Sequence, residues 1–302
     1  MKINRLVSDD QSSQPWLRGL IVASATAAIT EDAAQIAALL RQHGVPAIAG
    51  VETRSLARRL RETGAQRARI SAPWEADHDA ALAATLALPR WEDQDFVGQV
   101  SPTDVQTYGD AGEPLVAVID FGLKANIVRA LRTRGFRVRV HPHTTSADEV
   151  LGGGARGVVL SPGPGDPARL DGPVALARAL IAARVPLLGI CLGHQIIGRA
   201  AGASTRRLAF GHHGANHPVR DLPSGSVYVT AQNHEVEVVG DTIPASSGFH
   251  VSQINLNDRS VEGLRHAELP IETVQYHPEG SPGPLDATPV FDRFSRAIEA
   301  RR

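Results

Sequence analysis

The chain has 302 residues, a length that suits one large domain or two of ordinary size. Hydrophobic residues make up 42% and charged residues 21%, so the chain can bury a sizeable core and wholesale disorder is excluded. The 31 Lys and Arg residues are balanced by 32 Asp and Glu residues, which argues against nucleic acid or an anionic membrane as the main partner.

The single cysteine, Cys191, excludes an intrachain disulfide and a multi-thiolate zinc site, and leaves packing or catalysis as its role. Residues 1–13 lack the apolar run of a secretory signal. No stretch approaches the roughly 20 apolar residues that span a bilayer. We therefore expect a cytoplasmic protein.

The first part of the chain has a small α/β pattern. An apolar run predicts a strand at 17–23, and helices are predicted at 30–43, 53–64 and 80–88. In the second helix, Thr53 is a suitable cap at the start and Gly64 at the end. This helix carries four arginines, which form either a solvated basic face or a subunit contact: Arg54, Arg58, Arg59 and Arg61.

Residues 101–114 are rich in Ser, Pro, Thr, Asp and Gly, which is typical of a linker. We therefore expect a smaller α/β domain at 1–112 and a second domain at 113–302. In the second domain, strands are predicted at 115–120, 137–140, 157–161 and 186–190, and helices at 124–134, 174–183, 193–201 and 288–302. This alternation predicts a doubly wound, mostly parallel sheet, with an antiparallel extension from Val227 onward.

Cys191 lies between a predicted strand and a predicted helix, in the sequence Gly189-Ile190-Cys191-Leu192-Gly193. Flanking glycines allow the tight turn of a nucleophile elbow, which exposes the nucleophile at the carboxyl end of the sheet. The N-terminus of the following helix favours the thiolate, and the N–H of Leu192 can face a developing oxyanion. The alternative is a small cysteine packed at a strand end.

A catalytic thiol needs a base, and His277 follows the strand-like residues 271–276. Glu279 lies two residues further on, so its side chain returns to the same side as His277 and can orient the imidazole. His-Pro-Glu alone is equally typical of a capped strand end. Together with the cysteine elbow, it favours a Cys-His-Glu triad.

A rigid loop rich in glycine and proline, residues 161–167 (SPGPGDP), follows another strand. Such a loop can present backbone N–H groups to a substrate or an oxyanion. It lacks the Lys-Ser/Thr of a phosphate-binding P-loop, and by itself an ordinary tight loop is the better interpretation.

These motifs together resemble class I, triad-type glutamine amidotransferases, which have a flavodoxin-like fold: GICLGHQ (189–195), SPGPGDP and HPE (277–279). The segment FGHHGANHPV (210–219) narrows the resemblance to the small, glutamine-hydrolysing chain of carbamoyl-phosphate synthetase. So do TAQNH (230–234), SPGPLDA (281–287), and Asp120-Phe121-Gly122 with Asn126. The stretch 44–65 is similar to the first domain of that family.

The resemblance implies a role for each matching residue. Cys191 would attack the glutamine carboxamide and form a thioester, His277 would carry the proton to ammonia, and Glu279 would orient His277. The N–H groups of Leu192 and Gly163 would hold the oxyanion. Further matching positions would line the glutamine pocket: Gly165, Gln195, Asn233, Glu235 and Val236.

The resemblance also implies a partner, a large synthetase chain that uses the ammonia, with bicarbonate and ATP, to make carbamoyl phosphate. ATP and Mg²⁺ are expected on that chain and no cofactor on this one. The spacing of His212, His213, His217 and His234 fits no zinc pattern, so we interpret these histidines as hydrogen-bonding residues around the site.

The sequence departs from the family in two places. Nothing in it matches the family's TGYQE-like segment near the start, which contributes a serine to the glutamine pocket, so we expect a shortened first domain. Glu235 and Val236 stand where the family has Gly followed by Phe or Tyr. Glu235 either repels the glutamine carboxylate or points to solvent.

Three functions follow from the sequence. The first is an active glutaminase subunit of a carbamoyl-phosphate synthetase. The second is a regulatory or binding paralogue that pairs with a synthetase without efficient hydrolysis. The third is an amidotransferase subunit that serves another acceptor.

Overall fold

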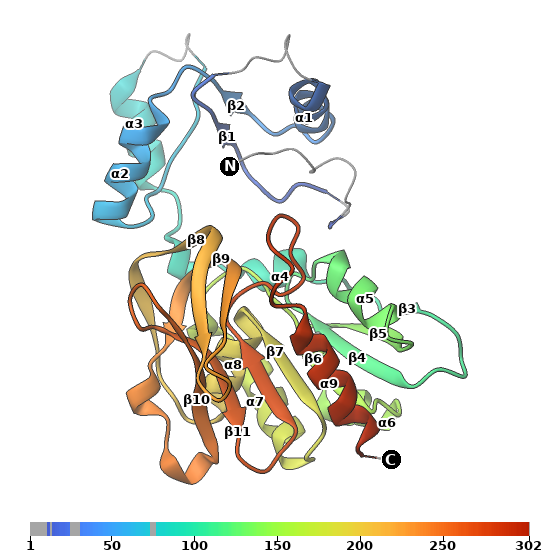
Figure 1. The fold of residues 1–302 in the computed structure, drawn as a ribbon. Helices are drawn as coiled ribbons and strands as arrows, with labels where there is room; N and C mark the ends of the chain where they lie inside the picture. The colour runs from blue at the N-terminus through green and yellow to red at the C-terminus, as the bar shows by residue number, and fades with distance from the viewer. Residues whose placement is uncertain (1–10, 13, 25–30, 73–76, 302) are drawn as a thin grey trace. The chain divides into compact units, whose positions relative to one another are not determined.

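The computed structural model describes residues 11–12, 14–24, 31–72 and 77–301, and it divides the chain into two compact units, Met1–Gln94 and Asp95–Arg302 (Figure 1). Among the described residues, no helix has both the length and the apolar character needed to cross a membrane.

The first unit is a small α/β structure. Its strands β1 (Leu20–Ile21) and β2 (Ala47–Ile48) pair in parallel, and α1 (Glu31–Gln42) connects them. The unit continues with α2 (Thr53–Thr63), α3 (His78–Leu86) and the 3-10 helix η1 (Trp91–Asp93). The three predicted helices are thus confirmed, whereas the predicted strand at 17–23 is reduced to two residues.

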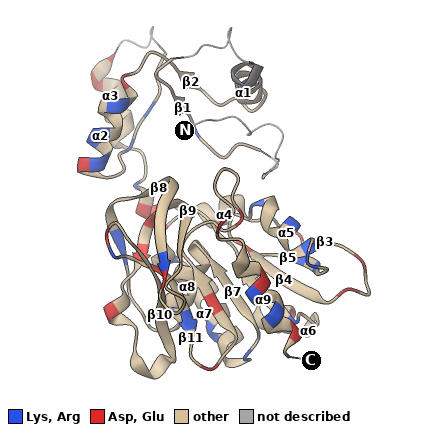
Figure 2. Cartoon of the chain, in the orientation of Figure 1, with Lys and Arg blue, Asp and Glu red and all other residues tan. Residues whose placement is uncertain are grey.

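Helix α2 begins one residue earlier than its sequence suggested. The N-cap is Glu52, whose carboxylate accepts a hydrogen bond from the N–H of Arg54, so the prediction of Thr53 as the cap was wrong. Gly64 ends the helix as predicted, with a φ of 74° that favours glycine. The four arginines of this helix are exposed, and Figure 2 colours the Lys and Arg positions along the chain blue.

The second unit is a ten-stranded sheet with helices on both faces. The helical elements are α4 (Phe96–Val100), α5 (Ala125–Arg132), α6 (Ala147–Gly152), η2 (Pro167–Arg169), α7 (Asp171–Ala182), α8 (Leu192–Ala200), η3 (Gly240–Thr242), η4 (Ala245–Ser247) and α9 (Pro289–Glu299). The strands are β3 (Gln106–Tyr108), β4 (Leu115–Asp120), β5 (Arg137–Pro142), β6 (Gly157–Leu160), β7 (Leu187–Ile190), β8 (Thr205–Asp221), β9 (Val227–Val238), β10 (Phe249–Asn255), β11 (Val261–His266) and β12 (Ile271–Val274).

The strand order is β3-β5-β4-β6-β7-β12-β11-β10-β8-β9. The five strands from β5 to β12 in this order are parallel, and the strands beyond them pair antiparallel. This confirms the predicted doubly wound, mostly parallel sheet. The antiparallel extension starts at Thr205, earlier than predicted, because β8 is rich in His, Gly and Arg and lacks an apolar alternation.

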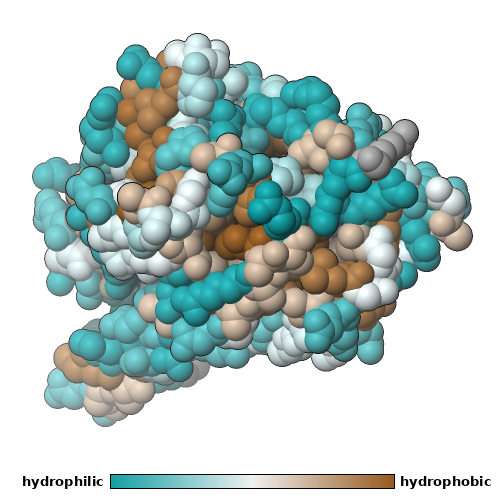
Figure 3. All heavy atoms as spheres, turned by 90° about the horizontal axis from the view of Figure 1, so that it is seen from below, coloured by the Kyte–Doolittle hydropathy of each residue, from teal (hydrophilic) through white to brown (hydrophobic). Residues whose placement is uncertain are grey.

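Alternating residues of the central strands contribute to two hydrophobic cores, one on each face of the sheet. Val116 and Val118 of β4 pack with residues of α5 and α9, whereas Ala117 and Ile119 pack with residues of α7 and α8. On the face shown in Figure 3, hydrophobic atoms reach the surface in separate patches between hydrophilic residues.

The segment that resembles a linker belongs to the second unit. Val97 of α4 is buried in the core beside Phe121, and β3 pairs antiparallel with β5. Contacts therefore group residues 95–112 with the sheet. The boundary between the compact units lies between Gln94 and Asp95, whereas the composition of the sequence indicated a boundary near residue 112. A three-residue edge strand leaves little trace in a polar sequence, which explains the difference.

Candidate active site

The turn around Cys191 has the geometry of a nucleophile elbow. Cys191 lies between β7 and α8 with a φ of 53°, a value that non-glycine residues adopt only under strain. A Cβ atom on Gly193 would come within 2.1 Å of the carbonyl oxygen of Leu160, and one on Gly189 within 2.7 Å of the oxygen of Gly193. Both glycines are therefore required by the close approach of backbone on either side of the sulfur.

The adjacent strand β12 brings His277 to this turn. β12 and β7 are parallel neighbours, with Val274 opposite Ile190, and the N–H of Cys191 donates to the carbonyl of Val274 at 2.8 Å. The chain that leaves β12 then passes the sulfur. Its next residues include His277, whose side chain lies close enough to Cys191 that the sulfur helps to raise the pKa of the imidazole.

Glu279 lies behind the imidazole, and its Oε1 is 2.7 Å from Nδ1 of His277. The three residues are almost fully buried, with exposed fractions of 3% for Cys191, 7% for His277 and 3% for Glu279. The structure thus brings the three predicted triad residues together in the order sulfur, imidazole, carboxylate. Nε2 is the imidazole nitrogen that remains to exchange a proton with the sulfur.

Burial and charge set the protonation of this group. Burial alone lowers the pKa of His277, but the charges of Glu279 and Cys191 outweigh it and raise the pKa to about 9. Burial likewise raises the pKa of Glu279, whereas His277 and then Lys124 outweigh it and lower the pKa to about 2. At neutral pH the site therefore holds an imidazolium beside a carboxylate.

Two residues that the sequence did not single out complete the surroundings of the triad. The ammonium of Lys124 is 3.1 Å from Oε1 of Glu279, and Nε2 of Gln275 lies 3.7 Å from the sulfur of Cys191. The sequence motifs assigned no function to either residue. The only sequence signal for Gln275 is its position two residues before His277. In an extended chain, side chains two residues apart point to the same side.

The loop 161–167 is joined to the elbow by backbone contacts. The N–H of Gly193 donates to the carbonyl of Ser161 at 3.1 Å, and a Cβ atom on Gly163 would lie 2.3 Å from the carbonyl oxygen of Phe121. Gly165 has a φ of 98°. Leu192, the first residue of α8, has an N–H group without an acceptor inside the helix. The predicted oxyanion donors, Leu192 and Gly163, thus belong to two segments that are hydrogen-bonded to each other.

The expected glutamine-pocket residues from α8 and β9 lie around the sulfur. The backbone oxygen of Asn233 is 4.0 Å from Sγ of Cys191. Gln195 is buried, and its Nε2 donates to the carbonyl of Val236 at 2.7 Å and to Oε1 of Gln275 at 3.0 Å. The Gln195 amide group therefore joins α8 to β9 and to Gln275, just beyond β12.

Glu235 is ion-paired. The two expectations for it, repulsion of the glutamine carboxylate or a side chain that points to solvent, therefore do not describe it fully. Its Oε1 is 3.0 Å from Nε2 of His213, and its Oε2 is 3.7 Å from a terminal nitrogen of Arg207. The hydrogen bond from His213 is the main cause that lowers the pKa of Glu235. Its negative charge is thus compensated by two cationic side chains of β8.

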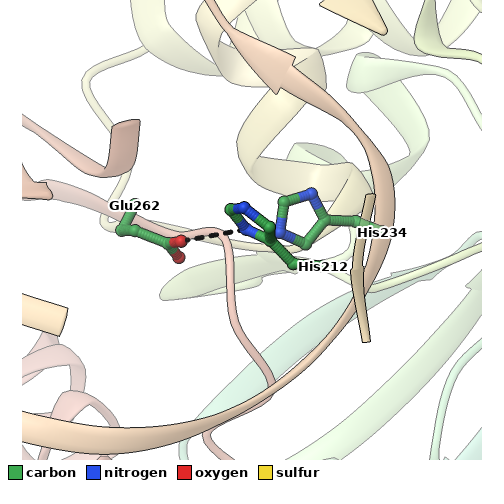
Figure 4. A group of neighbouring side chains, drawn as sticks. All are labelled: His212, His234 and Glu262. Carbon is green, nitrogen blue, oxygen red and sulfur yellow. Dashed lines mark ion pairs between the residues drawn. The ribbon is translucent and has the colours of Figure 1, made fainter. Parts of the chain in front are cut away.

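A group that could offer metal ligands lies among the described residues: His212, His234 and Glu262, whose ligand atoms are within 4.8 Å of one another (Figure 4). Hydrogen bonds occupy most of these atoms. The two ring nitrogens of His234 are 2.9 Å from the carbonyl oxygen of Val236 and 2.6 Å from Oε1 of Gln232. Because both ring nitrogens of His234 already face hydrogen-bonding partners, and burial holds its pKa well below the ordinary value, we describe the group as a hydrogen-bonded network.

His212 and Glu262 belong to the same network. Nε2 of His212 is 2.7 Å from Asp258, and its Nδ1 is 3.5 Å from Oε1 of Glu262. The Glu262 carboxylate accepts hydrogen bonds from Gln232 at 2.8 Å and Asn255 at 2.9 Å. The network thus joins β8, β9, β10 and β11, and it supports the strand that carries Asn233.

The chain is similar to proteins of known families along most of its length. Residues 117–297 match the family model "Glutamine amidotransferase class-I", and residues 4–70 match "Carbamoyl-phosphate synthase small chain, CPSase domain". The chain is 44% identical to the carbamoyl phosphate synthase small chain of Methanopyrus kandleri over 84% of this chain and 71% of that one. It is 41% identical to the protein of the same name from Bacillus caldolyticus, over 98% of this chain and 80% of the relative.

A solved structure with a similar fold is that of a protein from Thermoplasma acidophilum, assigned as part of a GMP synthase. The TM-score is 0.55 and the sequence identity 24%, over 64% of this chain and 98% of the other. At this identity the likeness shows the fold alone, and it agrees with the sheet of the second unit.

Proposed function

The chain belongs to the carbamoyl phosphate synthase small chain family, and we propose that it hydrolyses glutamine through a triad of Cys191, His277 and Glu279. The family makes it an enzyme of the glutamine amidotransferase class. The observation that supports the triad most directly is the buried row of sulfur, imidazole and carboxylate, with the sulfur on a strained turn.

The reaction begins with the Cys191 thiolate and the His277 imidazolium. The sulfur attacks the carboxamide carbon of glutamine, and the N–H groups of Leu192 and Gly163 stabilise the oxyanion that forms. His277 gives its proton to the departing nitrogen, so the C–N bond breaks and ammonia leaves with a thioester on Cys191. Water, deprotonated by His277, then cleaves the thioester and releases glutamate.

Glu279 and Lys124 act on the imidazole and its carboxylate. Glu279 fixes the orientation of His277 and stabilises its charged form. Lys124 adds a positive charge 3.1 Å from the Glu279 carboxylate, which keeps that carboxylate ionised in its buried position. The pocket that receives the glutamine would include Gly165, Gln195, Asn233, Glu235 and Val236.

The ammonia would pass to a large synthetase chain, because the relatives are named carbamoyl phosphate synthase small chain, which implies a large chain as partner. On that chain it would combine with bicarbonate and ATP to give carbamoyl phosphate. We place ATP and Mg²⁺ on the large chain and no cofactor on this one. Transfer without release suits the chemistry, since ammonia in neutral water is largely protonated and no longer nucleophilic.

A glutaminase assay of the purified chain, with and without a large chain, ATP and bicarbonate, tests this function. We expect slow hydrolysis by the chain alone, a faster rate in the assembled enzyme, and loss of both rates in Cys191→Ala. Full activity of the alanine variant would refute the triad. A wild-type chain that assembles but does not hydrolyse glutamine would instead favour a regulatory paralogue, and hydrolysis without carbamoyl phosphate formation would favour another acceptor.

A further inference from the structure

A bulge in the β8–β9 pair lies beside the candidate active site. Arg207 is opposite Val236 and His212 is opposite His234, so four residues of β8, 208–211, face the single residue Glu235 of β9. Gly211 in this bulge has a φ of 61°, and a Cβ atom there would lie 2.7 Å from the carbonyl oxygen of His234. The bulge is thus packed closely against β9 at Glu235.

Glu235 contacts β8 on both sides of this bulge. Its carboxylate is 3.7 Å from Arg207, which precedes the bulge, and 3.0 Å from Nε2 of His213, which follows it. One carboxylate therefore holds β8 before and after the four-residue bulge. A glycine at position 235, as in the family pattern, has no side chain to make them.

His213 extends the contact to Asn233. Its Nδ1 is 3.0 Å from Oδ1 of Asn233, while its Nε2 is 3.0 Å from Glu235. Since both partners accept hydrogen bonds, both ring nitrogens donate, and this arrangement holds His213 as an imidazolium. Within the described part of the chain, Nδ2 of Asn233 makes no hydrogen bond, so its two hydrogens are available to an acceptor outside the protein.

We propose that Glu235 is a positioning residue for glutamine binding, which acts through His213 to hold Asn233 beside Cys191. The inference rests on the proposed function and deepens it. Asn233 is the link to the chemistry, since its backbone oxygen lies 4.0 Å from the sulfur. With Oδ1 held by His213, the Asn233 amide presents its N–H groups to the carboxylate end of the substrate. The ion pairs with His213 and Arg207 compensate the negative charge of Glu235, so it does not repel that carboxylate.

The charged groups around His213 come from both strands. Glu235 faces its ring from β9, and Arg207, His212 and His217 lie on β8, the last with its Nε2 3.3 Å from the carbonyl of His213. The hydrogen bond to Glu235 raises the pKa of His213, and the charge of His212 opposes that rise. Substrate binding should therefore weaken as the pH rises through this raised pKa, because neutral His213 can donate only one of its two hydrogen bonds.

Steady-state glutamine hydrolysis by Glu235→Gln over a range of pH tests the proposal. We expect KM to rise about tenfold near neutral pH with kcat changed less than about twofold, and the rise of KM with pH to begin at a lower pH than in the wild type. The matched control is Glu237→Gln, which removes the same charge from the same strand but pairs with Arg206. It should keep the wild-type pH dependence of KM.

Equal pH dependence in Glu235→Gln and the wild type would overturn the proposal, as would the same shift in Glu237→Gln. An NMR titration of the His213 ring tests the Glu235–His213 contact without any turnover. It therefore distinguishes failure of this inference from failure of the proposed glutaminase function. We expect the wild-type pKa to lie above 6.5, the ordinary value, and to fall in Glu235→Gln. If that variant does not fold, an ordinary His213 pKa in the wild-type protein alone contradicts the inference.

Discussion

At the scale of single residues, the site depends on two glycines that allow backbone to pass close to the nucleophile. The strained backbone at Cys191 is held on both sides by hydrogen bonds, from its own N–H to Val274 and from the N–H of Gly193 to Ser161. The sequence GICLG predicts this turn by itself, since no other residue type fits the space at Gly189 or Gly193.

Substitution of Gly193 by alanine tests this claim. The new methyl group would meet the carbonyl oxygen of Leu160 at 2.1 Å, so the loop 161–167 or α8 must move. We expect a loss of roughly 1–3 kcal/mol in unfolding free energy and loss of glutaminase activity. Gly152→Ala is the control, because a Cβ atom there meets nothing within 4 Å. Equal stability and activity of the two variants, measured by thermal unfolding and the glutaminase assay, would contradict the account.

The His277–Glu279 pair predicts a pH dependence of stability. The raised pKa of His277, about 9 against an ordinary 6.5, contributes stability that is complete below pH 6.5 and is lost as the pH rises through 9. The lowered pKa of Glu279, about 2 against 4.5, contributes stability that is complete above pH 4.5 and is lost as the pH falls through 2. The advantage of the wild type over Glu279→Gln should therefore be largest between pH 4.5 and 6.5.

Denaturant unfolding followed by circular dichroism measures this difference. Tryptophan fluorescence is unsuitable, because Trp16, Trp74 and Trp91 all precede the second unit. Asp292→Asn serves as the control, since it removes an exposed carboxylate that pairs with Arg134 away from the triad. A difference between wild type and Glu279→Gln that stays constant from pH 6.5 to 9 would show that the two groups are not coupled as described.

At the scale of elements, neighbouring strands β7 and β12 deliver the nucleophile and the base to one end of the sheet. The sequence predicted a strand before each motif, but it placed residues 271–276 in the antiparallel extension, whereas β12 pairs in parallel with β7 and ends at the same edge. It did not predict the contacts of Glu235 or Lys124. These depend on which strands become neighbours and on a bulge in β8, and a polar sequence with several glycines does not specify that register.

Helix α9 covers the sheet face that carries the core of α5. Ile298 packs against Gly157 at the start of β6, where a Cβ atom would meet its side chain at 2.6 Å. Ile298→Ala should lower the unfolding free energy by about 2–4 kcal/mol and leave activity at 25 °C nearly intact, whereas Glu299→Ala at the exposed neighbouring position should change it by less than about 0.5 kcal/mol. Similar melting temperatures of the two variants would contradict the docking of α9.

At the scale of the whole molecule, both hydrophobic cores lie within the second unit. The alternation of strands and helices was enough to predict this sheet, because its buried strands are continuous apolar runs. The composition was not enough to place the start of the unit. Val97 and the β3 residues lie among Ser, Pro and Gly, and only their tertiary contacts reveal where they belong.

Two fragments test the boundary. A fragment of residues 95–302 should fold cooperatively, whereas a fragment of residues 113–302 lacks Val97 and the pairing of β3 with β5, and should melt at a lower temperature. We expect a loss of roughly 1–3 kcal/mol from the missing buried contacts. Identical melting curves, measured by circular dichroism, would show that residues 95–112 add nothing to the unit.

The central claim is that Cys191 forms a covalent thioester with the glutamyl group of the substrate. Mass spectrometry of the protein quenched with acid during glutamine turnover tests it most directly. We expect a glutamyl adduct on the peptide that contains Cys191, present in the wild type and absent from Cys191→Ala. Release of glutamate at the wild-type rate by Cys191→Ala, with no adduct on any peptide, would contradict it.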